Sequence, residues 1–181
     1  RLQYLAYREL TRTVAEHQAR SGSVVVLDVA SGEILAMVNV PSFNPNARDL
    51  GSPEGRRNRA LTDVLEPGSV VKPFVVAAAM EAGLAYPELV VDTSPGTMQV
   101  SGHTIRDVRN YGELTVTGIL TKSSNVGVVQ LALGMDPRHL WSMYSRLGFG
   151  QVTGTGFPGE SAGVLRDYER WRKLEQATLS Y

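Results

Sequence analysis

The sequence predicts an α+β fold, in which a β-hairpin precedes several helices. Two β-rich apolar runs, Ser23–Val29 and Glu33–Val38, are joined by Ala30–Gly32. Short connections that contain glycine are typical of antiparallel hairpins. Further along the chain, long apolar segments that stop at a glycine indicate helices. These segments are Val70–Ala82, Thr117–Leu133 and Pro137–Leu147.

The remaining segments alternate between short elements and loops. We expect short strands or turns around Thr97–Val100 and Thr104–Val108. Breaker residues are too frequent for regular structure over residues 41–59 and 151–163. Arginines at the end of the first loop could hold a phosphate, but a solvated or ion-paired loop is the better interpretation because no aromatic residues flank them.

Both ends of the chain have helical periodicity, over Arg1–His17 and Arg166–Ser180. No capping residue precedes the first helix, and neither glycine nor proline ends the last one. We therefore expect residues 1–181 to be part of a longer polypeptide.

Composition excludes several classes of protein. The chain has 181 residues with 18 basic and 18 acidic side chains, so a basic nucleic-acid module is not expected. It contains no apolar run of the roughly 18 residues that a membrane helix needs. Cysteine is absent, and the three histidines are too far apart for a zinc site or a Ser-His-Asp triad. We expect no metal and no cofactor.

The most informative chemistry lies at the predicted start of the helix Val70–Ala82. Proline is tolerated only in the first turn of a helix, so Pro73 places the helix start near Ser69. Ser69 and Lys72 then share one helix face. A buried lysine loses its charge more easily and can take a proton from a serine hydroxyl, which makes the serine a nucleophile. The alternative is that Ser69 only caps the helix and Lys72 is a surface lysine.

A second polar cluster interrupts the apolar segment Thr117–Leu133. It contains Ser123, Ser124 and Asn125, which are unfavourable inside a helix. These residues could simply mark a local break where side chains satisfy turn amides. Together with Ser69 and Lys72, they instead match two of the three motifs of serine acyltransferases: Ser-x-x-Lys, Ser-x-Asn and Lys-Thr-Gly. The third motif is absent from this chain.

With these motifs in place, the chain resembles the transpeptidase domain of class B penicillin-binding proteins. The likeness is greatest to the division-septum peptidoglycan D,D-transpeptidases of Gram-negative bacteria, and only the N-terminal portion of that domain is covered by residues 1–181. Matching segments are Asp28–Met37, Ser42–Asn46, Arg57–Ala60, Leu65–Phe74, Thr117–Gly127, Phe157–Glu160 and Ala177–Tyr181. Val70 stands where the family usually has threonine.

The resemblance implies a β-lactamase/transpeptidase-like fold, an antiparallel sheet sandwiched by helices and incomplete in this chain. Ser69 would be the acylated nucleophile, Lys72 its base, Ser123 the proton carrier to the leaving group, and Asn125 a ligand of the substrate amide. The substrate would be a peptidoglycan stem peptide ending in D-Ala-D-Ala, with β-lactam antibiotics as mimics. Without the Lys-Thr-Gly strand, we expect residues 1–181 alone to be inactive.

The resemblance also implies a cellular setting. The parent protein would act in septal cell-wall synthesis at the periplasmic face of the inner membrane, anchored by a segment outside this chain, with divisome membrane proteins as partners. Two alternatives remain open from the sequence. One is a serine β-lactamase, for which Glu160 is the nearby candidate to activate a water. The other is a non-catalytic β-lactam-binding or sensing module.

Overall fold

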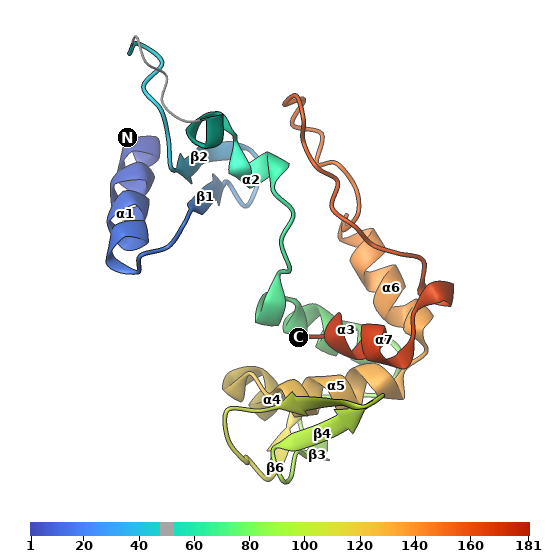
Figure 1. The fold of residues 1–181 in the computed structure, drawn as a ribbon. Helices are drawn as coiled ribbons and strands as arrows, with labels where there is room; N and C mark the ends of the chain where they lie inside the picture. The colour runs from blue at the N-terminus through green and yellow to red at the C-terminus, as the bar shows by residue number, and fades with distance from the viewer. Residues whose placement is uncertain (48–52) are drawn as a thin grey trace. The chain divides into compact units, whose positions relative to one another are not determined.

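The computed structural model describes residues 1–47 and 53–181, and the chain folds as two compact units (Figure 1). Unit 1 contains residues 1–64 and 154–161, and unit 2 contains residues 65–153 and 162–181. Helices and antiparallel strands are both present, so the predicted α+β class is confirmed. The strands form three separate two-stranded antiparallel sheets.

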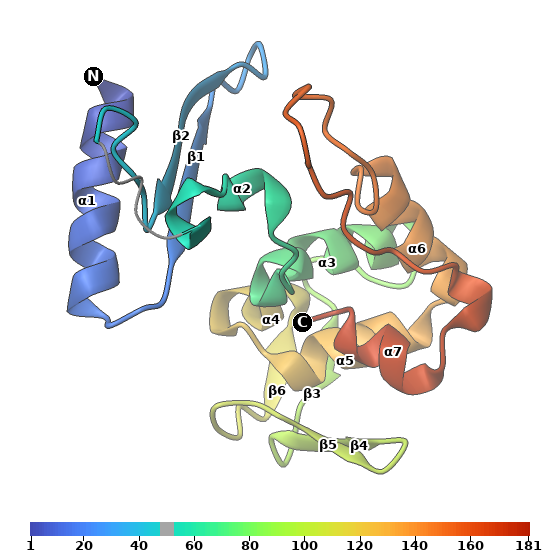
Figure 2. The same ribbon diagram turned by 45° about the horizontal axis from the view of Figure 1, so that its top comes forward.

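Unit 1 is built on the predicted hairpin. Strand β1 (Gly22–Leu27) pairs with strand β2 (Ile34–Val40), and Val24 lies opposite Val38. Helix α1 (Leu2–Glu16) lies alongside the hairpin (Figure 2). The side-chain amide of Gln3 bonds to both the N–H and the C=O of Met37, at 2.9 and 2.6 Å. This contact ties the helix to the backbone of β2.

The segment after the hairpin carries the arginine-rich part of unit 1. Residues 48–52 of the predicted loop 41–59 lie outside the described residues. The described remainder includes a short 3-10 helix η1 (Pro53–Arg56) and helix α2 (Arg59–Thr62). Arg57 and Arg59 both pair with the carboxylate of Asp63. The ion-paired interpretation of these two arginines is therefore confirmed.

Unit 2 contains the main hydrophobic core. Helices α3 (Lys72–Glu81), α5 (Asn125–Gly134) and α6 (Pro137–Arg146) pack against one another, with α4 (Val116–Lys122) and α7 (Lys173–Thr178) around them. Helix α5 carries apolar side chains around most of its circumference. Their removal from water stabilises the fold. The buried residues of α5 are Val126, Gly127, Val128, Val129, Leu131 and Ala132.

Two short sheets complete unit 2. Strand β3 (Val90–Asp92) pairs with β6 (Glu113–Thr115), and β4 (Thr97–Val100) pairs with β5 (His103–Arg106). The last pair confirms the strands expected around residues 97–108. β5 contacts α5, so the residue that follows β5 lies close to the start of that helix.

Two predicted helices are wrong in extent. The segment Thr117–Leu133 is two helices, α4 and α5, because Ser123 adopts a left-handed conformation between them. The expected helix Arg166–Ser180 is a 3-10 turn η3 (Tyr168–Arg170) followed by the short α7. In both places apolar periodicity continues across a break that side-chain capping produces, so periodicity alone does not reveal the break.

The packing of α5 gives a stability prediction for the complete domain. A Cβ atom added at Gly127 would lie 2.6 Å from Ile119 Cγ1, inside the core. Gly127→Ala should therefore lower the free energy of unfolding by about 1–3 kcal/mol, as overpacked cores do. Gly134→Ala is the matched control in the same helix, because nothing lies within 4 Å of its added Cβ. Equal denaturation midpoints for the two variants would contradict this packing.

Candidate active site

The start of α3 places a lysine amine inside unit 2. The 3-10 helix η2 (Gly68–Val71) leads into α3, with Pro73 in its first turn as the sequence predicts. Lys72 is the first residue of α3, and only 1% of its surface is exposed. A buried ammonium loses its hydration and needs protein acceptors in return. The alternative of a snorkelling surface lysine is excluded.

Three acceptors surround the Lys72 amine, and all come from the α4–α5 junction. Nζ donates to the Ser123 carbonyl at 2.6 Å, to Ser123 Oγ at 3.0 Å and to Asn125 Oδ1 at 2.6 Å. An ammonium has three protons, so these contacts satisfy its full donor capacity. The structure thus brings together three of the four residues that the sequence singles out, although more than fifty positions separate Lys72 from the other two.

The α4–α5 junction owes its shape to a left-handed residue and a helix cap. Ser123 has φ 53° and ψ 42°, which directs its carbonyl and hydroxyl toward the same amine. Ser124 is fully buried and caps α5, since its Oγ accepts a hydrogen bond from Gly127 N at 2.9 Å. The interpretation of a break with side-chain caps is therefore also right: it describes Ser124, while Ser123 and Asn125 face Lys72.

Asp107, which the sequence analysis did not select, holds this junction from the end of β5. Its Oδ2 accepts the Ser124 hydroxyl at 2.6 Å, and its Oδ1 accepts the N–H groups of Asn125 and Val126 at 2.5 and 3.0 Å. Asn125 Nδ2 also donates to the Arg106 carbonyl at 2.9 Å. Since 17 to 19 positions separate these partners, no local sequence pattern indicates them.

Two opposing effects act on the pKa of Lys72. Burial of the amine is the larger effect and lowers the pKa, because the charged form loses hydration. The negative charge of Asp107 partly offsets it and raises the pKa. The net result is a pKa below the usual lysine value of 10.5. A neutral amine, which can accept a proton, is thus easier to form here than on the surface.

Ser69 lies in η2, and its side chain is exposed. In a 3-10 helix, residues three positions apart lie one above the other, so Ser69 and Lys72 share one face of this turn. Among the described residues, no hydrogen bond joins Ser69 Oγ to Lys72 Nζ, whose donors point to Ser123 and Asn125. The expected proximity therefore rests on the 3-10 spacing alone.

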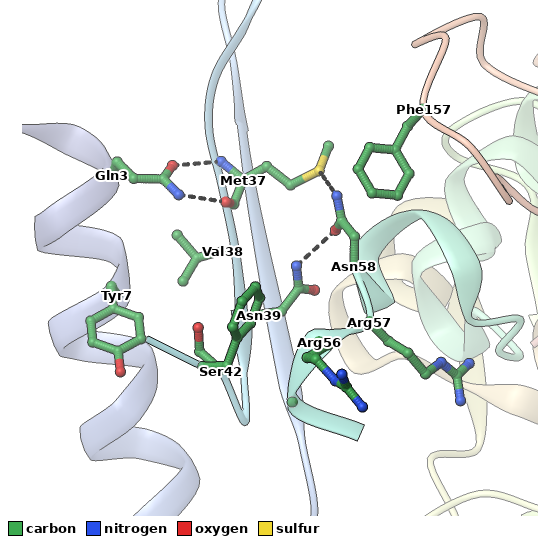
Figure 3. Close-up of a pocket in the computed structure, with 12 residues that line it drawn as sticks. Gln3, Tyr7, Met37, Val38, Asn39, Ser42, Arg56, Arg57, Asn58 and Phe157 are labelled. Atoms are coloured by element: carbon green, nitrogen blue, oxygen red, sulfur yellow. Dashed lines mark hydrogen bonds between the residues drawn. The ribbon is translucent and has the colours of Figure 1, made fainter. Parts of the chain in front are cut away.

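Unit 1 has its own pocket of about 390 Å³ (Figure 3). Gln3, Met37, Asn39, Asn58 and Phe157 are among its lining residues. The amide groups at the pocket are already used within the protein: Gln3 bonds to the Met37 backbone, and Asn39 Nδ2 donates to Asn58 Oδ1 at 2.7 Å. The buried amine of Lys72, unlike these amides, can accept a proton in its neutral form. We therefore take Lys72 and the residues bonded to it as the candidate active site.

The sequence and the fold define the same class of protein. The family model for the penicillin-binding protein transpeptidase domain matches residues 22–181, so the chain belongs to that family. The chain is 49% identical over all 181 residues to the peptidoglycan D,D-transpeptidase FtsI of Escherichia coli strain K12. It is 46% identical to the probable peptidoglycan D,D-transpeptidase PenA of Neisseria flavescens. It spans 30% and 45% of the lengths of these relatives.

A solved structure agrees with these relatives. The transpeptidase domain of penicillin-binding protein 3 from Burkholderia pseudomallei superimposes with a TM-score of 0.87 at 41% identity. The alignment covers 99% of this chain and 50% of that one. The fold expected from the family resemblance is confirmed.

The left-handed turn at Ser123 can be tested by stability. Both Ser123→Ala and Ser123→Gly remove the hydroxyl that accepts from Lys72, but only alanine keeps a Cβ in the left-handed conformation. Ser123→Ala in the complete domain should therefore be about 1 kcal/mol less stable than Ser123→Gly. Chemical denaturation measures the difference. Because glycine is normally the more destabilising residue, a more stable alanine variant would contradict a left-handed Ser123.

Proposed function

We propose that the chain is the N-terminal portion of the catalytic domain of a peptidoglycan D,D-transpeptidase that cross-links stem peptides through an ester on Ser69. Membership of the penicillin-binding protein transpeptidase family supports the reaction class. The observation that carries the assignment of residues is the buried Lys72 amine, bonded to Ser123 and Asn125 and placed one 3-10 turn after Ser69.

The proposed reaction begins with acylation. Neutral Lys72 takes the proton of the Ser69 hydroxyl, and Ser69 Oγ forms a bond to the carbonyl carbon of the penultimate D-alanine. The bond from this carbon to the terminal D-alanine nitrogen then breaks. The proton passes from Lys72 through Ser123 to that nitrogen, and D-alanine leaves.

The second half of the reaction resolves the ester. The amine of a neighbouring stem peptide attacks the ester carbonyl, forms the new peptide bond and releases Ser69. Lys72 and Ser123 take the proton from the attacking amine and return one to Ser69 Oγ. Asn125 Nδ2 donates to the Arg106 carbonyl while its Oδ1 accepts from Lys72. This fixed amide is suited to orient the amide of the bound peptide.

The wider setting is also part of the proposal. The relatives named as D,D-transpeptidases support a place in cell-wall synthesis, here at the periplasmic face of the inner membrane during septation. Among residues 1–47 and 53–181, no helix is long and apolar enough to cross a membrane. The membrane anchor, the divisome partners and the Lys-Thr-Gly strand are proposed to belong to other parts of the parent protein.

Acylation by a labelled penicillin tests the nucleophile in the complete domain. The β-lactam amide bond opens when Ser69 attacks, and the ring nitrogen stays attached, so the adduct persists and can be located by mass spectrometry. Wild type should carry one adduct on Ser69, and Ser69→Ala should carry none. Ser142→Ala, on α6, is the matched serine control and should be labelled like wild type.

The same experiment discriminates the alternatives. A wild-type adduct on a different serine would remove Ser69 from the proposed role, and the lack of any adduct would favour a non-catalytic module. Rapid nitrocefin turnover would instead indicate a β-lactamase. Glu160, the candidate for activating water in that case, lies in unit 1 and accepts a hydrogen bond from Thr155 Oγ1 at 2.9 Å.

The pH dependence of acylation tests the base. Only the neutral form of Lys72 accepts a proton, and burial lowers its pKa. The acylation rate should therefore rise with pH through that lowered pKa and level off above it, at a pH below 10.5. Lys72→Arg should lose this rise and most of the rate, because a guanidinium stays protonated. A wild-type rate that does not change with pH would exclude Lys72 as the base.

A further inference from the structure

We infer that Asp107 is a positioning residue of this active site, which holds the α4–α5 junction in the geometry that the Lys72 amine requires. The inference rests on the proposed function, because it concerns the same acylation. Asp107 touches neither Ser69 nor Lys72 through any hydrogen bond among the described residues. It acts through the residues that do contact Lys72.

The carboxylate of Asp107 makes several contacts with the start of α5. Asp107 accepts three hydrogen bonds, from the Ser124 hydroxyl and from the N–H groups of Asn125 and Val126. The two N–H groups belong to the first turn of α5, which has no intrahelical acceptors for them. A carboxylate at this end also interacts favourably with the helix dipole. One side chain thus fixes the start of α5 and the buried cap residue together.

The junction that Asp107 holds contains the residues that bond to Lys72. Ser123 and Asn125, which accept from Nζ, lie on either side of Ser124. Because Asp107 binds both Ser124 Oγ and Asn125 N, a shift of its carboxylate would also move Ser123 and Asn125, the two residues that accept from Lys72. The left-handed Ser123 is an unfavourable conformation that its surroundings must maintain. Asp107 supplies that restraint.

The backbone of Asp107 is itself held in place by the β4–β5 hairpin. Its backbone N–H donates to the Gly96 carbonyl at 2.9 Å. Gly96 has φ +84°, and an added Cβ there would lie 2.9 Å from Asn110 Cα, so this approach requires glycine. β4 and β5, which flank this contact, pair along four residues each. The carboxylate is therefore aimed at α5 by regular backbone structure.

Besides holding the junction in place, Asp107 affects the protonation of Lys72 through its charge. Its negative charge favours the protonated form of Lys72, opposite to the effect of burial. The other groups that face Lys72 from the α4–α5 junction, Ser123 and Asn125, are uncharged, and Lys122 is exposed. On α6, Arg146 pairs with Glu81 at the opposite end of α3. Removal of the Asp107 charge should therefore shift the pH dependence as well as the geometry.

Asp107→Asn separates these effects from simple unfolding. Asparagine keeps the shape, but its Nδ2 cannot accept the Ser124 hydroxyl. In the complete domain, the plateau rate of acylation by a fluorescent penicillin should fall roughly tenfold or more, as for misplaced catalytic groups. The rise of the rate with pH should move to lower pH, because the charge that favours protonated Lys72 is gone. A merely structural role would leave the position of that rise unchanged.

Two further variants make the test specific. Ser124→Ala breaks the link to Asp107 and keeps the negative charge, so the plateau should fall without a shift in pH dependence; it also serves as the test should Asp107→Asn not fold. Asp136→Asn is the matched control. Asp136 caps α6 through Arg138 N at 2.8 Å, so this variant should retain the wild-type plateau and pH dependence.

The outcomes distinguish this inference from the proposed function. Wild-type labelling together with a wild-type plateau and pH dependence in Asp107→Asn would overturn the positioning role alone. A fall in plateau of equal size in Asp136→Asn would also overturn it, since loss of any carboxylate charge at a helix start would then suffice. A wild-type domain that takes no label would overturn the proposed function, and this inference with it.

Discussion

Burial of one amine governs the arrangement of unit 2 around its candidate site. Lys72 is 1% exposed, and a charge in that position is unfavourable unless its three protons find acceptors. The acceptors lie on a helix junction far away in sequence, so the site exists only when α3 is packed beside α4 and α5. The packing of these helices and the hydrogen bonds of the Lys72 amine therefore depend on each other.

This mutual dependence explains why polar residues interrupt an otherwise apolar segment. In a continuous helix over residues 117–133, the backbone carbonyls would accept hydrogen bonds within the helix. No carbonyl would then be available to accept a hydrogen bond from Lys72. The left-handed Ser123 breaks the helix and exposes a carbonyl to the amine, while Ser124 begins the next helix with its own cap. Two of the unfavourable residues in the helical pattern, Ser123 and Asn125, are those that bond to Lys72, as expected where local preference conflicts with the fold.

The sequence predicts those parts of the site that short spacing encodes. Ser69 and Lys72 lie three positions apart at a helix start that Pro73 indicates. Ser123 and Asn125 lie two positions apart, so each pair can be recognised from the sequence alone. The β1–β2 hairpin is likewise encoded by neighbouring residues. Asp107 is not, because its contacts with the start of α5 depend on how the β4–β5 hairpin packs against that helix. Helix limits fail for a similar reason: capping at Ser124 and Asp167 is invisible to apolar periodicity.

The central claim is that burial makes Lys72 a base, and its titration tests this most directly. In the complete domain, the ζ-nitrogen resonance of Lys72 can be followed by NMR against pH and assigned by its absence in Lys72→Arg. The account predicts a midpoint below the usual lysine value of 10.5, because loss of hydration outweighs the opposing charge of Asp107. A midpoint at or above that value would contradict it.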